Sequence, residues 1–407
     1  MLAYARHLLM LMLWQRPATI IACAAVLGAL GLIAGACGSA LVGQRREAHK
    51  LMARDWPQAL TFLLFCLADW ALLWALPTLR LSFAPAITPP LFLSISVRLL
   101  VFWGLLGATL LARCRGRRRG IEGPARAVTV LFLAANLGLS AIQVDAYVIE
   151  PLLVETTELS LAFDDLDPNA PPVRMVHLSD VHVERSSYRE AMVVRRVNAL
   201  QPDLIVLTGD YLNLSYLSDP TSAAHFRQFA AQLEAPYGIY AVRGSVEPTP
   251  ESMRRLVEGT NVVWLEQEAV TVNVRGQPVT LVGVATSSRH ALDTARLKEA
   301  MDGIPGEAFT VLLYHLPDLI HRAAGQQVDL VLSGHTHGGQ VRLPFYGALV
   351  TNSRYGRQYA AGLFEEGPTT MYVSRGLGFE GGDLPRVRLL CRPEIVSLEL
   401  RGKDPAP

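Results

Sequence analysis

Six acidic and imidazole side chains follow short apolar runs at widely separated points of the chain. The residues are Asp180, His182, Asp210, His315, His335 and His337. Carboxylates and neutral imidazoles are common ligands of divalent cations, and a shared carboxylate offsets the repulsion between two cations held about 3.5 to 4 Å apart. This pattern indicates a two-metal hydrolytic site in which Asp210 is the natural bridging ligand.

Mixed nitrogen and oxygen ligands without thiolate favour manganese, iron or zinc over magnesium or calcium. Hydroxide held between two such cations can attack a phosphorus atom in line, while the cations neutralise charge that develops on the phosphoryl oxygens. The predicted chemistry is therefore hydrolysis of a phosphoester. Any one of these histidines taken alone is more often a structural residue than a ligand, so the prediction depends on their convergence.

The elements that must position these residues have the β-branched composition of buried strands, with helical stretches between them. The predicted strands are Val173 to Leu178, Asp203 to Leu207, Gly238 to Val242, Val279 to Val284, Phe309 to Tyr314, Val328 to Leu332, Met371 to Val373 and Ile395 to Leu400. The segment Tyr188 to Leu200 is a predicted amphipathic helix. This alternation predicts a layered α/β fold. Because ligands gather at the carboxyl ends of strands in such sheets, we expect the six side chains to meet on one rim.

The first third of the 407-residue chain is much more apolar than the rest, and the net charge is only +1. Four stretches, at about 18–43, 57–79, 90–112 and 127–144, are long enough for transmembrane helices, which take roughly 20 residues. We therefore predict a transmembrane region over residues 1–150 and a catalytic domain over residues 151–407. A near-zero net charge gives no reason to expect nucleic acid as a partner, and no obligate protein partner is indicated.

Arginine and lysine gather between the first and second stretches and between the third and fourth, which predicts that both of these loops are cytoplasmic. The catalytic domain would then lie outside the cytoplasm, on a multi-pass cell-membrane protein. A cleaved signal peptide ending near Ala36 is the alternative for the first stretch. The fourth stretch is the shortest and contains Asn136, so a cytoplasmic domain is the alternative if it does not cross. Asp69 and Arg98 lie within two stretches, where we expect them to pair.

Longer motifs around the six residues resemble those of the calcineurin-like metallophosphoesterase superfamily, in its membrane-associated bacterial branch. The motifs are His177-Leu-Ser-Asp-Val-His182, Leu207-Thr-Gly-Asp210, Tyr314-His-Leu-Pro-Asp318, Ser333-Gly-His-Thr-His-Gly-Gly-Gln340, Tyr372-Val-Ser-Arg-Gly-Leu-Gly378 and Cys391-Arg-Pro-Glu394.

The resemblance implies a four-layer sandwich, with two mixed β-sheets flanked by helices. It also implies two divalent metal ions. Their ligands would be Asp180, His182, Asp210 and His337 at the first metal, and Asp210, His315 and His335 at the second.

The chain departs from the family pattern at Gly244-Ser-Val-Glu247, where an Asn ligand and an acid-base His would normally stand. We expect Ser245 to weaken the second metal site. Val246 cannot transfer a proton, and loss of a general acid typically costs a factor of about 10² to 10⁴ in rate. Glu247 could substitute as a ligand, and Tyr211 or His290 could replace the acid, although ordinary structural roles are more usual for such residues.

Two functions are consistent with these observations. The first is a membrane-anchored phosphoesterase that acts at the lipid bilayer on a phosphate or pyrophosphate ester, with a lipid-linked ester as one candidate. The second is a pseudoenzyme that binds a phosphorylated ligand without turnover. The six retained ligands favour the enzyme, and the altered Ser245-Val246 pair favours the pseudoenzyme. A transporter is less favoured, because the apolar stretches lack polar interruptions.

Overall fold

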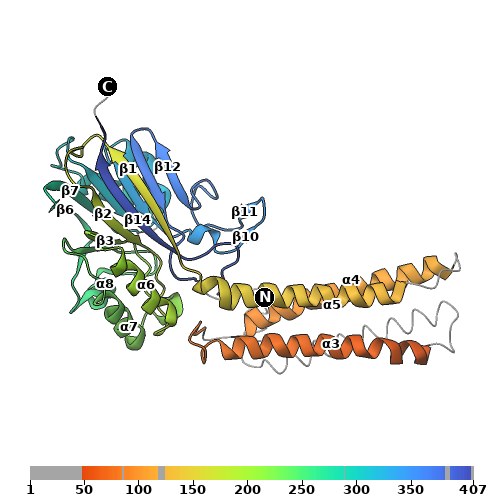
Figure 1. Cartoon of the computed structure of the whole chain (residues 1–407). Helices are drawn as coiled ribbons and strands as arrows, with labels where there is room; N and C mark the ends of the chain where they lie inside the picture. Colours follow the sequence, from red (N-terminus) through yellow and green to blue (C-terminus); the bar gives the residue numbers. More distant parts are fainter. Residues whose placement is uncertain (1–47, 85–86, 118–123, 288, 381–385, 405–407) are drawn as a thin grey trace. The chain divides into compact units, whose positions relative to one another are not determined.

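The computed structural model describes residues 48–84, 87–117, 124–287, 289–380 and 386–404 (Figure 1). The described residues form two compact units. The first comprises residues 48–79, 84, 87–117 and 124–145. The second comprises residues 80–83, 146–380 and 386–404. The short segment Arg80–Phe83 therefore belongs with the larger unit, although it lies in the chain between two helices of the smaller one.

Two six-stranded mixed sheets form the framework of the second unit (Figure 1). The first sheet has the order β1-β14-β2-β3-β4-β5, and the second has the order β12-β13-β9-β8-β7-β6. The first comprises β1 (Glu155–Phe163), β2 (Val173–Leu178), β3 (Leu204–Leu207), β4 (Ile239–Val242), β5 (Val262–Leu265) and β14 (Glu394–Gly402). The second comprises β6 (Gln267–Val274), β7 (Gln277–Val284), β8 (Thr310–Tyr314), β9 (Leu330–Ser333), β12 (Gly362–Glu366) and β13 (Thr369–Val373).

Alternate residues of each central strand supply different hydrophobic cores. In β2, Met175 packs in the core shared by the two sheets, whereas Val176 faces helices. The helices on that outer side are α6 (Tyr188–Ala199), α7 (Pro220–Ala230) and α8 (Pro250–Val257), and those that cover the second sheet are α9 (His290–Ala300) and α10 (Ile320–Ala324). This burial on both faces gives four layers, and the predicted mixed α/β sandwich is confirmed.

The eight predicted strands all occur, and their ends differ from the prediction by at most two residues. The predicted helix occurs as α6, where Ser187 and Glu190 form a reciprocal capping box at the start. The edge strands β1, β5, β6 and β12 were not predicted. Strand β1 pairs with β14 alone at the edge of the sheet and is mostly only half-buried, so its sequence lacks the continuous apolar run that marks the central strands.

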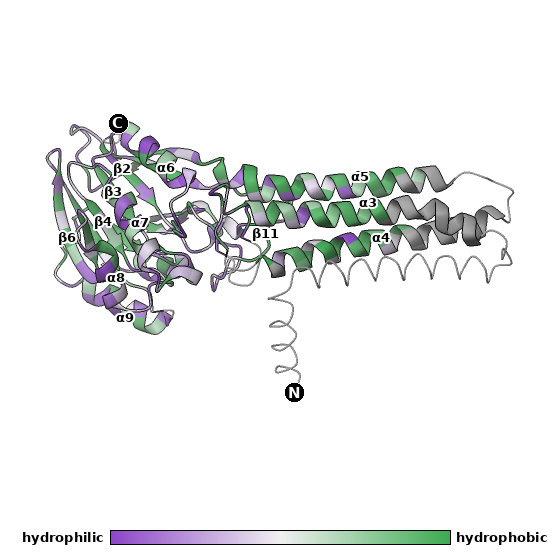
Figure 2. Ribbon diagram, turned by 90° about the horizontal axis from the view of Figure 1, so that it is seen from below, coloured by the Kyte–Doolittle hydropathy of each residue, from purple (hydrophilic) through white to green (hydrophobic). Residues whose placement is uncertain are grey.

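Three helices are described in the first unit: α3 (Ala48–Ala75), α4 (Thr88–Arg117) and α5 (Pro124–Val144). The coloured parts of these helices are largely apolar (Figure 2). The predicted stretches 57–79, 90–112 and 127–144 fall on these helices, whereas the stretch 18–43 lies outside the described residues.

Among the described residues, one helical segment, Val130–Leu152, is long and apolar enough to cross a membrane. Two shorter apolar helical segments, Leu60–Ala75 and Pro89–Leu105, lie within α3 and α4. The four-helix membrane bundle is therefore not found as predicted in the described residues, and a multi-pass arrangement remains a prediction.

The predicted pair of Asp69 and Arg98 is present within the first unit, and both side chains are buried. Arg98 donates from Nε and Nη2 to the two carboxylate oxygens of Asp69, at 2.6 and 2.7 Å. Its Nη1 donates to Asn136 Oδ1 at 2.9 Å, and Nη2 also donates to Ser140 Oγ at 2.7 Å. One guanidinium thus links α3, α4 and α5, which explains why Asn136 stands in an apolar helix.

Replacing Asp69→Asn leaves the Arg98 charge without its anion in an apolar environment. We expect the full chain in detergent to lose about 3–5 kcal/mol of unfolding free energy. The double variant Asp69→Leu with Arg98→Met removes both charges and should recover most of this loss. Unfolding followed by circular dichroism measures both effects. A double variant that is less stable than Asp69→Asn would contradict this account of the pair.

Candidate metal centre

The six predicted ligands lie in loops that follow the carboxyl ends of strands. Asp180 and His182 follow β2, and Asp210 follows β3, which runs parallel to β2 in the first sheet. His315 follows β8, and the loop after the parallel neighbour β9 carries the other two histidines. The two sheets therefore each contribute one group of loops to a common site.

Asp180, His182 and His337 bring their ligand atoms within 4.8 Å of one another. The Nε2 atoms of the two histidines are 3.1 Å apart, and their rings stack at 4.9 Å. Asp180 Oδ1 lies 3.4 Å from His337 Nε2 and 3.9 Å from His182 Nε2. Nitrogen ligands at about 2.1 Å from one cation lie roughly 3 Å apart, so this spacing fits a common ion.

A second group, Asp210, His315 and His335, also has its ligand atoms within 4.8 Å of one another. Asp210 Oδ2 is 3.1 Å from His315 Nε2 and 3.8 Å from His182 Nε2. His335 Nδ1 is 3.2 Å from His315 Nε2. The same Asp210 oxygen thus faces both groups, as a bridging ligand must.

Five of the six side chains belong to residues with left-handed backbone: Asp180, His182, Asp210, His335 and His337 have φ between 46 and 68°. Residues other than glycine adopt this conformation rarely, and each instance costs of the order of 1–3 kcal/mol. A fold keeps such strain where the position of a side chain matters more than local stability. The concentration of strain on these residues is a sign of function that no sequence pattern reveals.

Close approach of the loops requires glycine at several positions, of which Gly334 and Gly244 are the tightest at the ligands. A Cβ on Gly334 would lie 1.9 Å from Ser179 Oγ and 2.2 Å from Asp180 Oδ2. A Cβ on Gly244 would lie 2.3 Å from the Asp210 nitrogen. The backbone N–H of His335 donates to Asp180 Oδ2 at 3.0 Å. Without glycine at position 334, the loop after β9 could not bring this N–H so close to Asp180.

Glu247 holds the loop around Asp210 in place from behind. Its carboxylate accepts backbone N–H bonds from Asp210 at 3.1 Å, Tyr211 at 2.8 Å and Gly244 at 3.0 Å. Burial and the nearby Asp210 charge raise the pKa of Glu247 to about 7. Since its oxygens face backbone amides, Glu247 is a positioning residue, and the possibility that it replaces a metal ligand is not supported.

The side chains at the altered motif have different surroundings. Ser245 Oγ donates to Asp210 Oδ2 at 3.1 Å and lies 3.4 Å from His315 Nε2, so its hydroxyl lies beside the second group. Val246 is buried, and its backbone N–H donates to Asp210 Oδ1 at 2.9 Å.

Tyr211 is also buried and donates its hydroxyl to the Leu207 carbonyl at 3.1 Å, which makes it a poor replacement acid. His290 begins α9 and belongs to neither ligand group.

The protonation states suit cation binding at most of the ligands. Burial alone would raise the pKa of Asp210, but the His315 charge and hydrogen bond lower it well below its usual range. Burial lowers the pKa of His337 to about 3, so this ring is a neutral donor. His315 differs, because Asp210 overcomes the effect of burial and raises its pKa to about 9. Cation binding at His315 would therefore release a proton.

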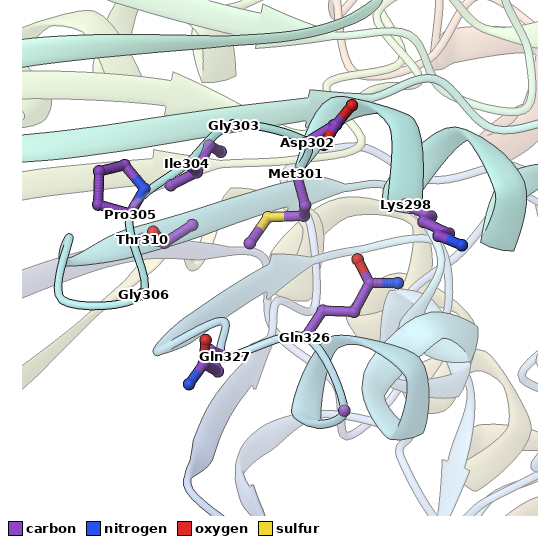
Figure 3. Close-up of a pocket in the computed structure, with 11 residues that line it drawn as sticks. Lys298, Met301, Asp302, Gly303, Ile304, Pro305, Gly306, Thr310, Gln326 and Gln327 are labelled. Atoms are coloured by element: carbon purple, nitrogen blue, oxygen red, sulfur yellow. The ribbon is translucent and has the colours of Figure 1, made fainter.

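A separate hollow of about 460 Å³ lies at the opposite ends of the second-sheet strands (Figure 3). Its lining includes Thr310, which begins β8, and Gln327, which precedes β9, whereas His315 follows the end of β8. The hollow does not contain either of the two ligand groups found among the described residues. The chemistry of the chain is therefore assigned to the strand ends with the six converging side chains.

Known proteins are similar in sequence to this part of the chain. The calcineurin-like phosphoesterase pattern matches residues 173–339. The metallophosphoesterase YkuE of Bacillus subtilis is 30% identical over 303 residues, which cover 71% of this chain and 98% of the relative. The chain belongs to the calcineurin-like phosphoesterase family.

Two further relatives are similar over most of their length. The transmembrane protein with metallophosphoesterase domain of Bos taurus is 30% identical over 300 residues, which cover 69% of this chain and 62% of the relative. The UDP-2,3-diacylglucosamine pyrophosphatase LpxG of Chlamydia trachomatis is 26% identical over 300 residues, which cover 61% of this chain and 89% of the relative. The family and these relatives make the chain a phosphoester hydrolase.

Calcineurin-like phosphoesterases use a dinuclear metal site, and the donors present here fit one. The two groups contain imidazole nitrogens and carboxylate oxygens without thiolate, and they share one carboxylate between them. This donor set suits manganese, iron or zinc. A pair of cations can activate water and offset charge on a phosphoryl group.

Replacing Gly334→Ala should displace Asp180, because the new methyl group would overlap Ser179 and the Asp180 carboxylate. We expect manganese affinity to fall about 10- to 100-fold, as for changes that disturb the support of metal ligands. Gly325→Ala is the matched control, because its nearest neighbour would be at 3.5 Å and its φ is −77°. Isothermal titration of both variants measures the difference. Equal affinity in both variants would show that the close approach at Gly334 is not needed.

His177 should make the metal-free protein sensitive to acid. Burial lowers its folded-state pKa to about 4 from 6.5. Between these values the unfolded chain binds a proton that the folded chain does not, so stability is lost as pH falls from about 6.5 towards 4. His177→Leu should remove this part of the slope, of the order of 3 kcal/mol in total. Thermal unfolding of the wild-type chain and of His177→Leu, in chelator at several pH values, gives the slope of stability against pH for each. Equal slopes would show that the pKa of His177 is not lowered by folding.

Proposed function

We propose that the chain is a membrane-anchored two-metal phosphoesterase that hydrolyses a phosphate or pyrophosphate ester of a lipid-linked substrate. The observation that carries the proposal is the pair of ligand groups joined by Asp210 Oδ2, which faces His182 at 3.8 Å and His315 at 3.1 Å. Asp180, His182, Asp210 and His337 would hold one cation. Asp210, His315 and His335 would hold the other. Bound cations supply an activated water and offset charge on the phosphoryl oxygens.

The remaining groups orient these ligands. The His315 ring contacts the Thr208 carbonyl through Nδ1 at 2.7 Å, which directs Nε2 towards Asp210. Asp180 accepts a hydrogen bond from Ser179 Oγ at 2.6 Å, in addition to the one from the backbone of His335. Such outer contacts fix ring orientation and ligand basicity. The chain thus supplies a preorganised site whose ligands need little rearrangement on binding.

The nature of the leaving group follows from Val246. An apolar side chain at this position cannot donate a proton to a departing oxygen, so alkoxide leaving groups would react slowly. Leaving groups that depart as stable anions need less assistance. A phosphate released from a pyrophosphate linkage is such a group, and it is the linkage class named for the relative LpxG. We therefore favour a pyrophosphate linkage over a simple alkyl phosphomonoester.

Membrane anchoring is supported by the apolar segment Val130–Leu152 and by the named transmembrane relative. The arginines at the end of α4 and in its connection to α5 favour a cytoplasmic position for that connection. If α4 and α5 both cross, the α3–α4 connection and the catalytic unit share the other side. The grouping of Arg80–Phe83 with the catalytic unit agrees with this, since Glu184 accepts hydrogen bonds from Ser82 and Phe83. We propose an extracytoplasmic catalytic unit.

The second candidate function is a phosphate-binding pseudoenzyme. The specific observation in its favour is the Ser245-Val246 pair, which removes an amide ligand and a proton donor from the family pattern. Ser245 Oγ lies beside the second ligand group, but a hydroxyl is a weaker neutral ligand than an amide oxygen. The two functions differ in metal content and in turnover of activated substrates.

The full chain purified in detergent with manganese should contain close to two metal ions per polypeptide and should hydrolyse an aryl phosphodiester. The double replacement Ser245→Asn with Val246→His restores the family pattern and should raise turnover by about 10²-fold. Asp210→Asn is the control, and it should lose both metal and activity because it removes the shared charge. Metal analysis by plasma mass spectrometry and release of the aryl alcohol give the two readouts.

One metal or none in the wild-type chain, together with no turnover in either form, would establish the pseudoenzyme instead. Activity that needs no metal would contradict both functions. A larger gain for a poor alkyl leaving group than for the aryl group would support the role assigned to position 246, because an added acid helps most where the departing oxygen is most basic.

A further inference from the structure

A small hairpin beside the metal centre exposes large apolar side chains. Strands β10 (Arg342–Leu343) and β11 (Gly347–Ala348) pair antiparallel and form this element, which we call the apolar hairpin, residues 342–350. The exposed fractions are 45% for Leu343, 111% for Phe345, 55% for Tyr346, 47% for Leu349 and 64% for Val350. Apolar side chains gathered on one exposed element mark an interaction surface.

The tip of the hairpin has a defined shape. Phe345 has a φ of 63°, an uncommon value for a bulky residue. The N–H of Tyr346 donates to the Pro344 carbonyl at 2.8 Å, which closes the turn. The side chain of Phe345 is thus presented at a tight, convex turn, and its full exposure shows that no wall surrounds it. A convex apolar tip suits insertion into a fluid layer better than enclosure of a ligand.

The base of the hairpin is packed against the loop that carries the metal-site histidines. Ala348 is buried, and a Cβ on Gly339 would lie 2.3 Å from the Ala348 Cβ. Where the chain leaves the hairpin, the Asn352 carbonyl lies 3.4 Å from His335 Nε2. Whatever the tip contacts is therefore held at a fixed place relative to the metal centre.

The charge of the surrounding segment has one sign. Residues 340–361 contain three arginines, Arg342, Arg354 and Arg357, and no acidic residue. The Arg357 guanidinium lies over the Tyr346 ring at 4.0 Å and donates to the Tyr346 carbonyl at 2.8 Å. Ion pairs found among the described residues do not include these three arginines. Aromatic and aliphatic side chains next to cationic ones are typical of elements that lie at the surface of anionic membranes.

We propose that the apolar hairpin inserts into the lipid bilayer surface, with Phe345 in the acyl region and the arginines at the lipid phosphates. The same chain contains a segment that is long and apolar enough to cross a membrane, so a bilayer is the available apolar phase. The inference deepens the proposed function and rests on it in one respect, namely that the substrate is a lipid-linked phosphoester. The hairpin would bring the headgroup of such a substrate beside His335.

The insertion can be tested in the full chain, reconstituted as one copy per nanodisc that contains anionic lipid. Phe345→Cys carries an environment-sensitive fluorophore, and lipids with a spin label near the headgroup serve as quenchers. Val263→Cys is the control, because Val263 is another exposed apolar residue of the same unit, with an exposed fraction of 45%, and it lies outside the apolar hairpin. The wild-type chain treated with the same label measures background from native cysteines.

We expect strong quenching at position 345 and little at position 263. Equal quenching at both positions, or none at 345, would overturn the proposal. A blue shift at 345 without lipid quenching that grows with protein concentration in detergent would show contact with a second copy instead. The same shift without any concentration dependence would show that another part of this chain covers the hairpin. Both results would also overturn the proposal.

A kinetic measurement separates the hairpin from the metal site. The double variant Phe345→Ser with Tyr346→Ser should raise KM for a diacylated pyrophosphate substrate in vesicles by at least about tenfold, which corresponds to roughly 1.4 kcal/mol of interfacial binding. Turnover of a soluble aryl phosphodiester should not change. An unchanged KM would contradict the role in substrate capture. If the wild-type chain hydrolyses neither substrate but position 345 is quenched, the insertion stands and the proposed function fails.

Discussion

Two carboxylates that are buried at the same place impose the main constraint on this structure. Asp180 and Asp210 are both almost completely removed from solvent, and like charges in such surroundings repel strongly unless cationic or hydrogen-bonding groups compensate them. Imidazoles from loops of both sheets and backbone N–H groups from two loops surround them. The strained backbone at five ligands and the glycines at the loop contacts follow from the need to bring these groups so close.

This constraint also explains the role of Glu247. A third carboxylate close to Asp210 would add further repulsion, but its oxygens bind three backbone amides and its raised pKa allows it to be neutral near pH 7. The loop that it holds carries Ser245 and Val246. The family scaffold around the site is therefore retained even where the side chains of the family pattern have changed, which is the physical basis for treating the chain as a hydrolase.

Buried carboxylates are compensated differently in the two units. In the first, Arg98 neutralises Asp69 directly, and its remaining N–H groups bind Asn136 and Ser140, so the network is closed. In the catalytic unit, the donors around the two carboxylates converge on each other, as at the Nε2 atoms of His182 and His337, 3.1 Å apart. Closed networks stabilise packing, whereas converging donors are what a bound cation requires.

The residue types and their order along the chain were enough to determine several features of this protein. Apolar runs predicted the eight central strands, because strands with both faces covered are largely apolar. The rule that parallel strands end on one rim then predicted that six distant side chains would meet. Asp69 and Arg98 could be paired because an isolated charge in an apolar helix is too costly.

Only the tertiary structure decided the rest. The edge strands β1, β5, β6 and β12 escaped prediction, and the half-exposed β1 has no distinctive pattern. The orientation of Glu247 towards backbone amides, the burial of Tyr211 and the left-handed backbone at the ligands depend on contacts between loops that are far apart in sequence. The exposure of the apolar hairpin was likewise invisible, because five apolar residues near a turn read equally well as core. Which side of such a segment is covered depends on its neighbours in space, and sequence patterns record only neighbours along the chain.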